Sequence, residues 1–129
     1  MPPQIHLIDQ TWIDASAQTV SSVVADSANW SSWWPALTLT VTRDRGIKGM
    51  RWAAEGEYRG SVEIWLEPCK SGVILHHFLR LEPSSGQRLS RGQVSRRTRQ
   101  LAWHAKRVFW ELKDQLESPG TSTSRQTAR

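Results

Sequence analysis

The order of hydrophobic and polar positions predicts one strand and two short helices in the first quarter of the chain. Residues 4–14 are rich in Ile, Leu, Thr and Trp, a composition typical of a strand. Ser16 then stands where the N-cap of a helix belongs, and apolar residues follow at helical spacing until about Asp26. Ser27 is the expected N-cap of a second short helix, which Pro35 ends because the residue before a proline avoids helical dihedral angles.

From residue 36 to residue 82 the hydrophobic period becomes two, which predicts a meander of four antiparallel strands. We expect turns at residues 44–46, 55–57 and 70–72, and Pro68 is expected to end the third of the four strands. The more apolar face of this sheet carries Leu37, Val41, Met50, Trp52, Val62, Ile64, Leu75 and His77. The opposite face carries Arg51, Glu63, Trp65, His76 and Arg80. We expect the first set to face the core; in the reverse orientation Arg51, Glu63, His76 and Arg80 would become the polar lining of a pocket.

A long amphipathic helix is predicted from about Leu89 to Glu117. Its apolar stripe comprises Val94, Leu101, Ala105, Val108, Leu112 and Leu116, widened by Ala102 and Phe109. Trp103 and Trp110 lie nearly opposite this stripe among basic residues, so we expect them to contact a second subunit or another part of the fold. Residues 118–129 contain mainly Pro, Gly, Ser, Thr and other polar residues and predict a disordered tail.

The second short helix carries an unusual concentration of tryptophan. Trp30, Trp33 and Trp34 fall within five positions, and their spacing of three and four places them near one helix face. A Trp side chain has a large apolar area and one N–H group that needs a partner when it is buried. The cluster therefore forms either the wall of a cavity or a tightly packed corner of the core.

Composition limits the class of protein. A chain of 129 residues suffices for one domain, which we assign to residues 1–117. No run of eighteen apolar residues occurs and no secretory signal is visible, so we expect no membrane span and a cytoplasmic location. The single cysteine, Cys69, permits neither an internal disulfide nor a metal site built from several thiolates.

The positive charge is concentrated in the last third of the chain. Residues 83–129 hold ten Lys and Arg against three Asp and Glu, out of a formal net charge of +5 for the whole chain. These residues fall in the predicted helix and tail without a recognisable nucleic-acid-binding motif. We therefore interpret them as a solvated helix surface and expect no nucleic-acid partner.

Four segments carry a resemblance to a known superfamily: Asp26–Pro35, Arg45–Trp52, Gly60–Pro68 and Gly72–Arg80. In these segments, and in the order of its predicted elements, the chain resembles the START-like, or polyketide cyclase/dehydrase (SRPBCC), superfamily over about residues 5–117. It looks most like a small Trp-rich group of cyclase-like proteins from high-GC Gram-positive bacteria. The resemblance implies an α+β helix-grip fold, in which a curved antiparallel sheet wraps a long C-terminal helix and leaves a cavity between them.

The chain departs from this superfamily in the length of its sheet. Typical members have two more strands before the last helix, whereas this sequence has room for about five strands rather than seven. The resemblance then implies a shorter sheet with a cavity that is smaller or more open. It also implies an unpaired sheet edge, which a second subunit could cover.

His77 is the candidate for chemistry, because it is a polar residue on the face expected to be apolar. A histidine in such a place can act as an acid or a base near neutral pH, with Asp9 or Glu57 as a helper near the rim. The alternative is a core histidine whose ring nitrogens are satisfied by backbone groups or water. No metal-ligand spacing, phosphate-binding loop or Ser–His–acid arrangement is present, and no cofactor is expected.

Three hypotheses for the function follow. The first is binding of a small hydrophobic molecule, lipid-like or aromatic, with Trp30, Trp33, Trp34 and Trp52 as walls and His77 giving one orienting hydrogen bond. The second is an enzyme of the cyclase or dehydratase type that uses His77 as acid or base. The third is an oligomeric interaction protein with a filled cavity, which would form a homodimer through Trp65, Trp103 and Trp110.

Overall fold

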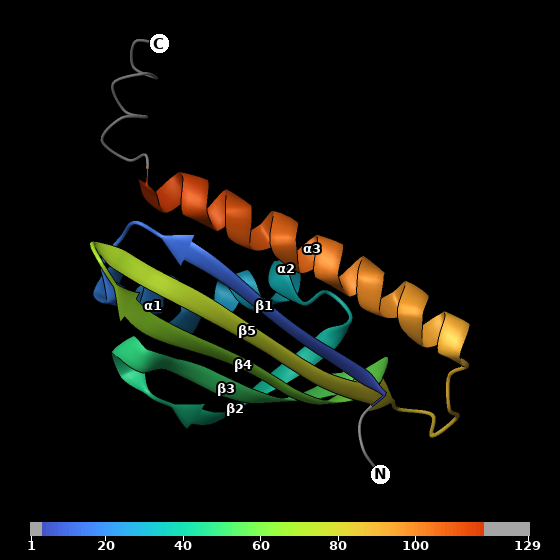
Figure 1. Ribbon diagram of the computed structural model, residues 1–129. Helices are drawn as coiled ribbons and strands as arrows, with labels where there is room; N and C mark the ends of the chain where they lie inside the picture. The colour runs from blue at the N-terminus through green and yellow to red at the C-terminus, as the bar shows by residue number, and fades with distance from the viewer. Residues whose placement is uncertain (1–3, 118–129) are drawn as a thin grey trace.

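Within residues 4–117, the part of the chain that the computed structural model describes, one five-stranded antiparallel sheet carries three α-helices (Figure 1). The strands are β1 (Ile5–Ile13), β2 (Leu37–Asp44), β3 (Gly49–Gly56), β4 (Tyr58–Cys69) and β5 (Gly72–Pro83). The helices are α1 (Ala17–Ala25), α2 (Trp30–Trp33) and α3 (Arg91–Glu117), with 3-10 turns η1 (Ser27–Asn29) and η2 (Gly46–Lys48). The spatial order β1-β5-β4-β3-β2 confirms the predicted meander and adds β1 beside β5. The predicted α+β architecture, with five strands and a long last helix, is confirmed; the expected tail lies outside the described residues.

Three of the predicted element boundaries need correction. Pro68 does not end β4, because it lies next to the β4–β5 hairpin, where β4 continues to Cys69. The last helix begins at Arg91 rather than Leu89, because Ser90 and Gln93 form a reciprocal capping box in which each side chain accepts from the other's backbone N–H.

The third correction concerns the caps of the short helices. The Ser16 hydroxyl accepts from the Thr19 N–H and caps α1 as predicted. The turn after α1 is capped by Asp26 rather than Ser27, because the Asp26 carboxylate accepts from the Ala28 N–H. A carboxylate and a hydroxyl are both favoured at such positions, so sequence alone could not separate two adjacent candidates.

The sheet has one buried face, which we call the inner face, and one exposed face, the outer face. Trp52, Val62 and His77 lie on the inner face and are completely buried. Arg51 and Arg80 lie on the outer face in contact with solvent, so the face assignment from the alternating pattern is confirmed. Val41 is an exception, since it was expected to be buried but is 40% exposed. It lies on the edge strand β2 beside a register shift between Val41 and Arg43, where the strand leaves the covered part of the sheet.

Helix α3 lies along β1 and covers its free edge (Figure 1). Ala105, Phe109 and Leu112 form its buried stripe. Lys106 Nζ donates to the Gln10 carbonyl at 3.1 Å, and Lys113 Nζ donates to the Trp12 carbonyl at 2.8 Å. At this edge of the sheet the same chain therefore supplies the cover that a second subunit was expected to provide.

Two glycines bring neighbouring strands closer together than any side chain would allow. Gly49 has φ 120° and Gly60 has φ 151°, both outside the range that side-chain-bearing residues favour. A Cβ atom on Gly60 would lie 1.9 Å from the Arg80 carbonyl oxygen, and one on Gly49 would lie 2.0 Å from that of Ile64. The two positions let β3 and β4 bend within the sheet.

No helix in the described part of the chain is both long enough and apolar enough to cross a membrane.

Candidate functional site

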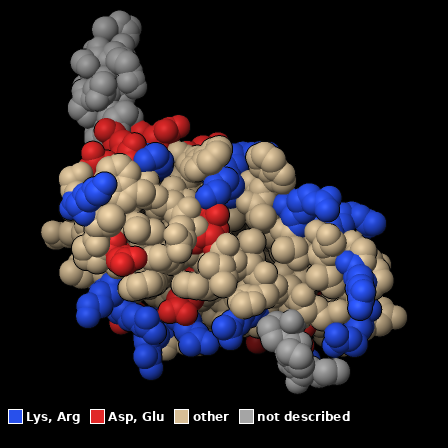
Figure 2. All heavy atoms as spheres, in the orientation of Figure 1, with Lys and Arg blue, Asp and Glu red and all other residues tan. Residues whose placement is uncertain are grey.

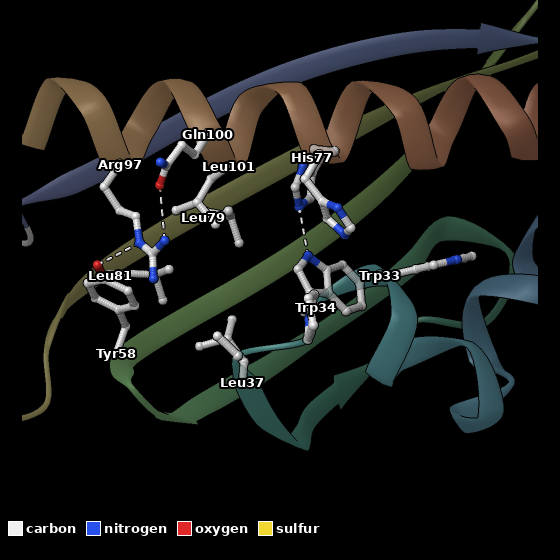
Figure 3. Close-up of a pocket in the computed structure, with 14 residues that line it drawn as sticks. Trp33, Trp34, Leu37, Tyr58, His77, Leu79, Leu81, Arg97, Gln100 and Leu101 are labelled. Atoms are coloured by element: carbon white, nitrogen blue, oxygen red, sulfur yellow. Dashed lines mark hydrogen bonds between the residues drawn. The ribbon is translucent and has the colours of Figure 1, made fainter.

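A cavity of about 190 Å³ lies between α3, the inner face of β5 and the segment that follows α2 (Figure 3). Its lining comprises Trp33, Trp34, Pro35, Ala36, Leu37, Tyr58, His77, Leu79, Leu81, Arg97, Gln100, Leu101, His104 and Ala105. The inner part of this lining is buried and mostly apolar. Pro35, Ala36 and Gln100 are exposed, so the cavity opens between the end of α2 and the N-terminal half of α3.

The size of the cavity limits what it can hold. A 150 Å³ apolar cavity is known to accept benzene, whereas sites for drug-sized ligands usually enclose about 300–1,000 Å³. With about 190 Å³, this cavity has room for one aromatic ring or a short aliphatic chain. The shortened sheet thus encloses a small cavity that is open at one side.

His77 lies at the inner end of the cavity and is completely buried. Its Nε2 accepts a hydrogen bond of 3.1 Å from the indole Nε1–H of Trp34 (Figure 3). Because an indole nitrogen can only donate, His77 Nε2 carries a lone pair and the ring proton is on Nδ1. Burial lowers the pKa of His77 to about 3, which agrees with a neutral ring.

This geometry weakens the case for acid–base chemistry. A ring with a pKa of about 3 holds no proton to donate from Nε2 near neutral pH, and Nε2 is occupied by Trp34. The two proposed helpers have partners of their own: Asp9 pairs with Lys106 at 2.8 Å and Glu57 with Arg97 at 2.8 Å. Asp9 lies opposite His77 in the β1–β5 register, yet no hydrogen bond joins the two side chains in the described structure.

Only part of the predicted tryptophan wall lines the cavity. Trp33 and Trp34 do, while Trp30 and Trp52 lie behind them. The rings of Trp34 and Trp52 are 5.0 Å apart, and Trp30 packs edge-on against Trp52 at 5.3 Å. Trp30 also donates its indole N–H to the Val24 carbonyl at 2.8 Å. Trp30 and Trp52 therefore support the wall without forming its surface.

A polar cluster at the mouth was not foreseen from the sequence. Arg97 Nε donates to the Tyr58 hydroxyl at 2.8 Å, Nη1 donates to Gln100 Oε1 at 3.0 Å, and Nη2 donates to both Glu57 oxygens at 2.8 Å. Partial burial disfavours the charge on Arg97, but Tyr58 and Glu57 outweigh this effect and raise the pKa of the guanidinium. One signal was present: Arg97 precedes Leu101 by four and Ala105 by eight residues, which places a charge in line with the apolar stripe.

His104 also lines the cavity, at the side that faces α2. Its Nε2 lies 3.0 Å from the Ser32 carbonyl oxygen, so this nitrogen is the donor and carries a proton. The contact joins the middle of α3 to α2 and holds one side of the mouth. No local pattern links these two residues, which are 72 positions apart in the chain.

The alternative polar lining lies on the outer face, away from the cavity. Arg51, Glu63 and Arg80 border a separate hollow of about 210 Å³ together with Ser61 and Phe78. His76 stacks on Trp65 with ring centroids 4.4 Å apart and lies 2.8 Å from a Glu67 oxygen. The reverse orientation, kept as the alternative in the sequence analysis, is not the one observed, since the inner face is the apolar one.

Large apolar side chains are exposed on the outer face and on α3. Trp103 is 65% exposed and Trp110 is 54% exposed, while Trp65 is 38% exposed on the outer face of β4. Strands β5 and β1 separate Trp65 from the two helical tryptophans, and Ile8 and Trp12 of β1 are exposed between them. Figure 2 shows mostly uncharged side chains over the middle of this view, interrupted by a few Asp and Glu side chains, while most Lys and Arg lie nearer its borders.

The described residues include no group of three or more His, Cys, Asp or Glu side chains placed to hold a metal ion. Cys69 is a half-buried free thiol at the end of β4. The residues that line the cavity offer apolar contact together with the hydrogen-bonding groups of Arg97, Tyr58, Gln100 and His77.

No protein-family model matches the chain, and no curated protein is significantly similar to it. Among solved structures, it is similar to a START superfamily protein from Mycobacterium smegmatis, with 12% identity and a TM-score of 0.68 over 86% of this chain and 98% of that chain. It is also similar to Aha1 from Colwellia psychrerythraea, solved as a dimer, with 14% identity and a TM-score of 0.58 over 88% of this chain and 96% of that chain.

A third similar structure is CalU16 from Micromonospora echinospora, with 14% identity and a TM-score of 0.56. The match covers 81% of this chain and 74% of that chain. Together with the sheet and the long last helix, these likenesses show a START-like helix-grip fold, as the resemblance in sequence implied. Because one fold hosts many functions, the function has to be argued from the cavity itself.

Proposed function

We propose that this protein binds a small hydrophobic molecule in the cavity between β5 and α3, with residues 1–117 acting as one binding domain. The proposal rests on one observation, an apolar cavity of about 190 Å³ that opens to solvent beside α2. Small-molecule sites are usually concave and mostly apolar, with a few polar groups that orient the ligand. Trp33, Trp34 and Leu79 supply the apolar contact in this proposal.

His77 is the polar group at the inner end of the proposed site. Its Nε2 is occupied by Trp34, whereas the buried Nδ1 has no hydrogen-bond partner in the described structure. A ligand oxygen that accepted from Nδ1–H would offset the cost of burying this donor. The proposal favours a carrier or sensor over an enzyme, because a neutral His77 with a pKa of about 3 suits hydrogen bonding better than proton transfer.

Phenylacetamide, a neutral molecule with one ring, tests this function. We expect isothermal titration calorimetry to detect saturable binding with one site per chain. Leu101→Trp places a large ring at the cavity wall and should abolish that binding. Leu116→Trp is the matched control, since Leu116 is a half-buried core residue of the same helix that does not line the cavity. The proposal fails if neither phenylacetamide nor the corresponding acid anion, phenylacetate, binds, or if the two variants weaken the binding of phenylacetamide equally.

A second candidate function is self-association through the exposed tryptophans. The observation that favours it is the exposure of Trp103 and Trp110 on the face of α3 turned away from the core. Exposed aromatic side chains of this size are typical of protein–protein contact surfaces. A dimer of this kind is compatible with ligand binding, because neither residue lines the cavity.

A further inference from the structure

The polar groups at the cavity mouth have their acceptors occupied and their donors free. Arg97 Nε donates to the Tyr58 oxygen, which leaves the hydroxyl proton of Tyr58 available. Arg97 Nη1 donates to Gln100 Oε1, so the two N–H groups of the Gln100 amide remain as donors. The amide orientation is fixed by this contact, because a guanidinium cannot accept a hydrogen bond. The mouth of the cavity therefore offers hydrogen-bond donors to whatever enters it.

The charged group that faces the cavity at its mouth is positive. Of the fourteen residues that line it in the described structure, Arg97 is the one with a formal charge. Glu57, its partner, does not line the cavity and has a side chain that is 53% exposed. Both Glu57 oxygens accept from Nη2, while Nη1, which carries two N–H groups, donates to Gln100 Oε1 and has no second partner among the described residues. A ligand inside the cavity would face Arg97 and not Glu57.

We infer that the ligand is a small carboxylic acid, whose apolar part fills the cavity and whose carboxylate is held by Arg97, Tyr58 and Gln100. This inference rests on the proposed function and specifies the ligand class. A carboxylate has no donor, can accept from the Tyr58 hydroxyl and the Gln100 amide, and gains a charge-assisted hydrogen bond from the guanidinium. The partial burial of Arg97, with 31% of its side chain exposed, reduces the screening of that interaction by water.

The apolar part of the acid follows from the rest of the lining. Beyond the mouth, Leu79 and Trp34 offer apolar surface and an indole whose N–H is already bonded to His77, and the His77 ring is the polar group at the inner end. A volume of about 190 Å³ suits one ring or a short acyl chain. Arylacetic acids and short-chain fatty acids both meet these requirements.

The competing role of Glu57 makes the inference testable in both directions. Glu57 shares Arg97 with any incoming carboxylate, so its removal should strengthen acid binding. Phenylacetate and phenylacetamide have the same ring and differ at the group placed against Arg97. We expect calorimetry to show phenylacetate binding about 10-fold tighter than phenylacetamide to the unmodified protein, which corresponds to one charge-assisted contact.

The variants separate this contact from general electrostatics. Arg97→Gln should weaken phenylacetate about 10-fold and leave phenylacetamide within about 2-fold, while Glu57→Gln should tighten phenylacetate alone. Tyr58→Phe keeps the ring and removes the hydroxyl, and should weaken the acid more than the amide. Arg99→Gln is the matched control, since Arg99 is an exposed arginine of α3 that does not line the cavity, and it should change neither affinity.

Two outcomes would overturn the inference, and they differ from failure of the proposed function. If phenylacetamide binds as tightly as phenylacetate, or if Arg99→Gln and Arg97→Gln weaken the acid equally, the cavity binds small molecules without a carboxylate site. If neither compound binds, the proposed function fails and the inference fails with it. Circular dichroism of each variant checks that Arg97→Gln folds, and Glu57→Gln tests the same contact if it does not.

Discussion

The ring of His77 behaves as a hydrogen-bonding group of the interior. The Trp34 indole fixes its tautomer, because an N–H donor requires a lone pair on Nε2. Burial removes the ring from solvent and lowers its pKa to about 3, against an ordinary value of 6.5. Both effects oppose a positive charge. The folded protein therefore keeps this ring neutral over the pH range in which a free histidine becomes protonated.

We predict that His77 makes the native state less stable as the pH falls. Its pKa is lower in the folded protein than in the unfolded chain, so its full contribution is present above about pH 6.5 and is lost progressively toward the folded value of about 3. The unfolded chain binds a proton in this window and the folded protein does not. When the pH falls from about 7 to about 5, this ring should lower the free energy of unfolding by about 2 kcal/mol. Urea denaturation at the two pH values measures the change.

The comparison of two variants isolates this ring from the other titrating groups. His77→Phe should remove about 2 kcal/mol of the pH dependence, while His6→Gln, at an exposed position of β1, should keep all of it. Nitrogen-detected NMR offers a second check, since the His77 ring should show the neutral Nδ1–H form at about pH 5. The prediction would be contradicted if the unmodified protein and His77→Phe lost the same unfolding free energy when the pH falls from about 7 to about 5.

The sequence identified the residues at the inner end of the cavity better than those at its mouth. His77, Trp33 and Trp34 stand out because a polar residue on an apolar face, and a cluster of tryptophans, are visible in one dimension. The mouth depends on Tyr58 and Arg97, which are 39 positions apart and meet only when α3 is laid on the sheet. No local pattern in the sequence encodes the orientation of α3 on the sheet, so the cluster could not be predicted.

At the scale of elements, the strands follow from alternation and α3 from its apolar stripe. Period two predicted the four strands of the meander because one face is buried, and the 3.6-residue period predicted the long helix for the same reason. The errors fall at element ends, where one capping side chain decides the boundary. Ser90 and Gln93 set the start of α3, and Asp26 takes the place expected for Ser27.

We predict that the docking of α3 depends on Phe109. This ring is 1% exposed and packs edge-on against Trp33 at 5.6 Å and His77 at 5.0 Å, so it joins α3 to α2 and to the sheet. Phe109→Ala should reduce the unfolding free energy by about 3–5 kcal/mol, because it leaves a cavity among rings that cannot move to fill it. Urea denaturation followed by circular dichroism measures the change.

The control for this prediction is a change of similar size on the exposed side of the same helix. Glu111→Ala should alter the unfolding free energy by less than about 0.5 kcal/mol, because Glu111 is exposed. A loss below about 1 kcal/mol in Phe109→Ala would show that α3 is held to the sheet mainly by its ends and by the Lys106 and Lys113 contacts to β1.

At the scale of the whole molecule, the five-stranded sheet and α3 form a START-like helix-grip fold with a cavity of about 190 Å³ between them. The START superfamily protein from Mycobacterium smegmatis shares this fold at only 12% identity, so the architecture tolerates nearly complete change of sequence. What such a fold binds is then decided by the few side chains that line its cavity. Here these are mostly apolar, with a single arginine at the mouth among the lining residues described.

We predict that the protein self-associates through α3, because its exposed tryptophans face away from the only core that the described chain forms. Lys106 lies 5.7 Å from the Trp110 ring centroid and pairs with Asp9, while the exposed Arg99 and Arg107 leave this face basic. Burying two indoles from each chain contributes a hydrophobic gain that opposes the repulsion between these basic side chains. Sedimentation velocity should show a concentration-dependent dimer.

Trp103→Ser combined with Trp110→Ser should shift this dimer to monomer, whereas Trp65→Ser tests whether the outer face of the sheet takes part in the contact. A monomer at every concentration in the unmodified protein would contradict the prediction and leave ligand binding unaffected, since these tryptophans do not line the cavity.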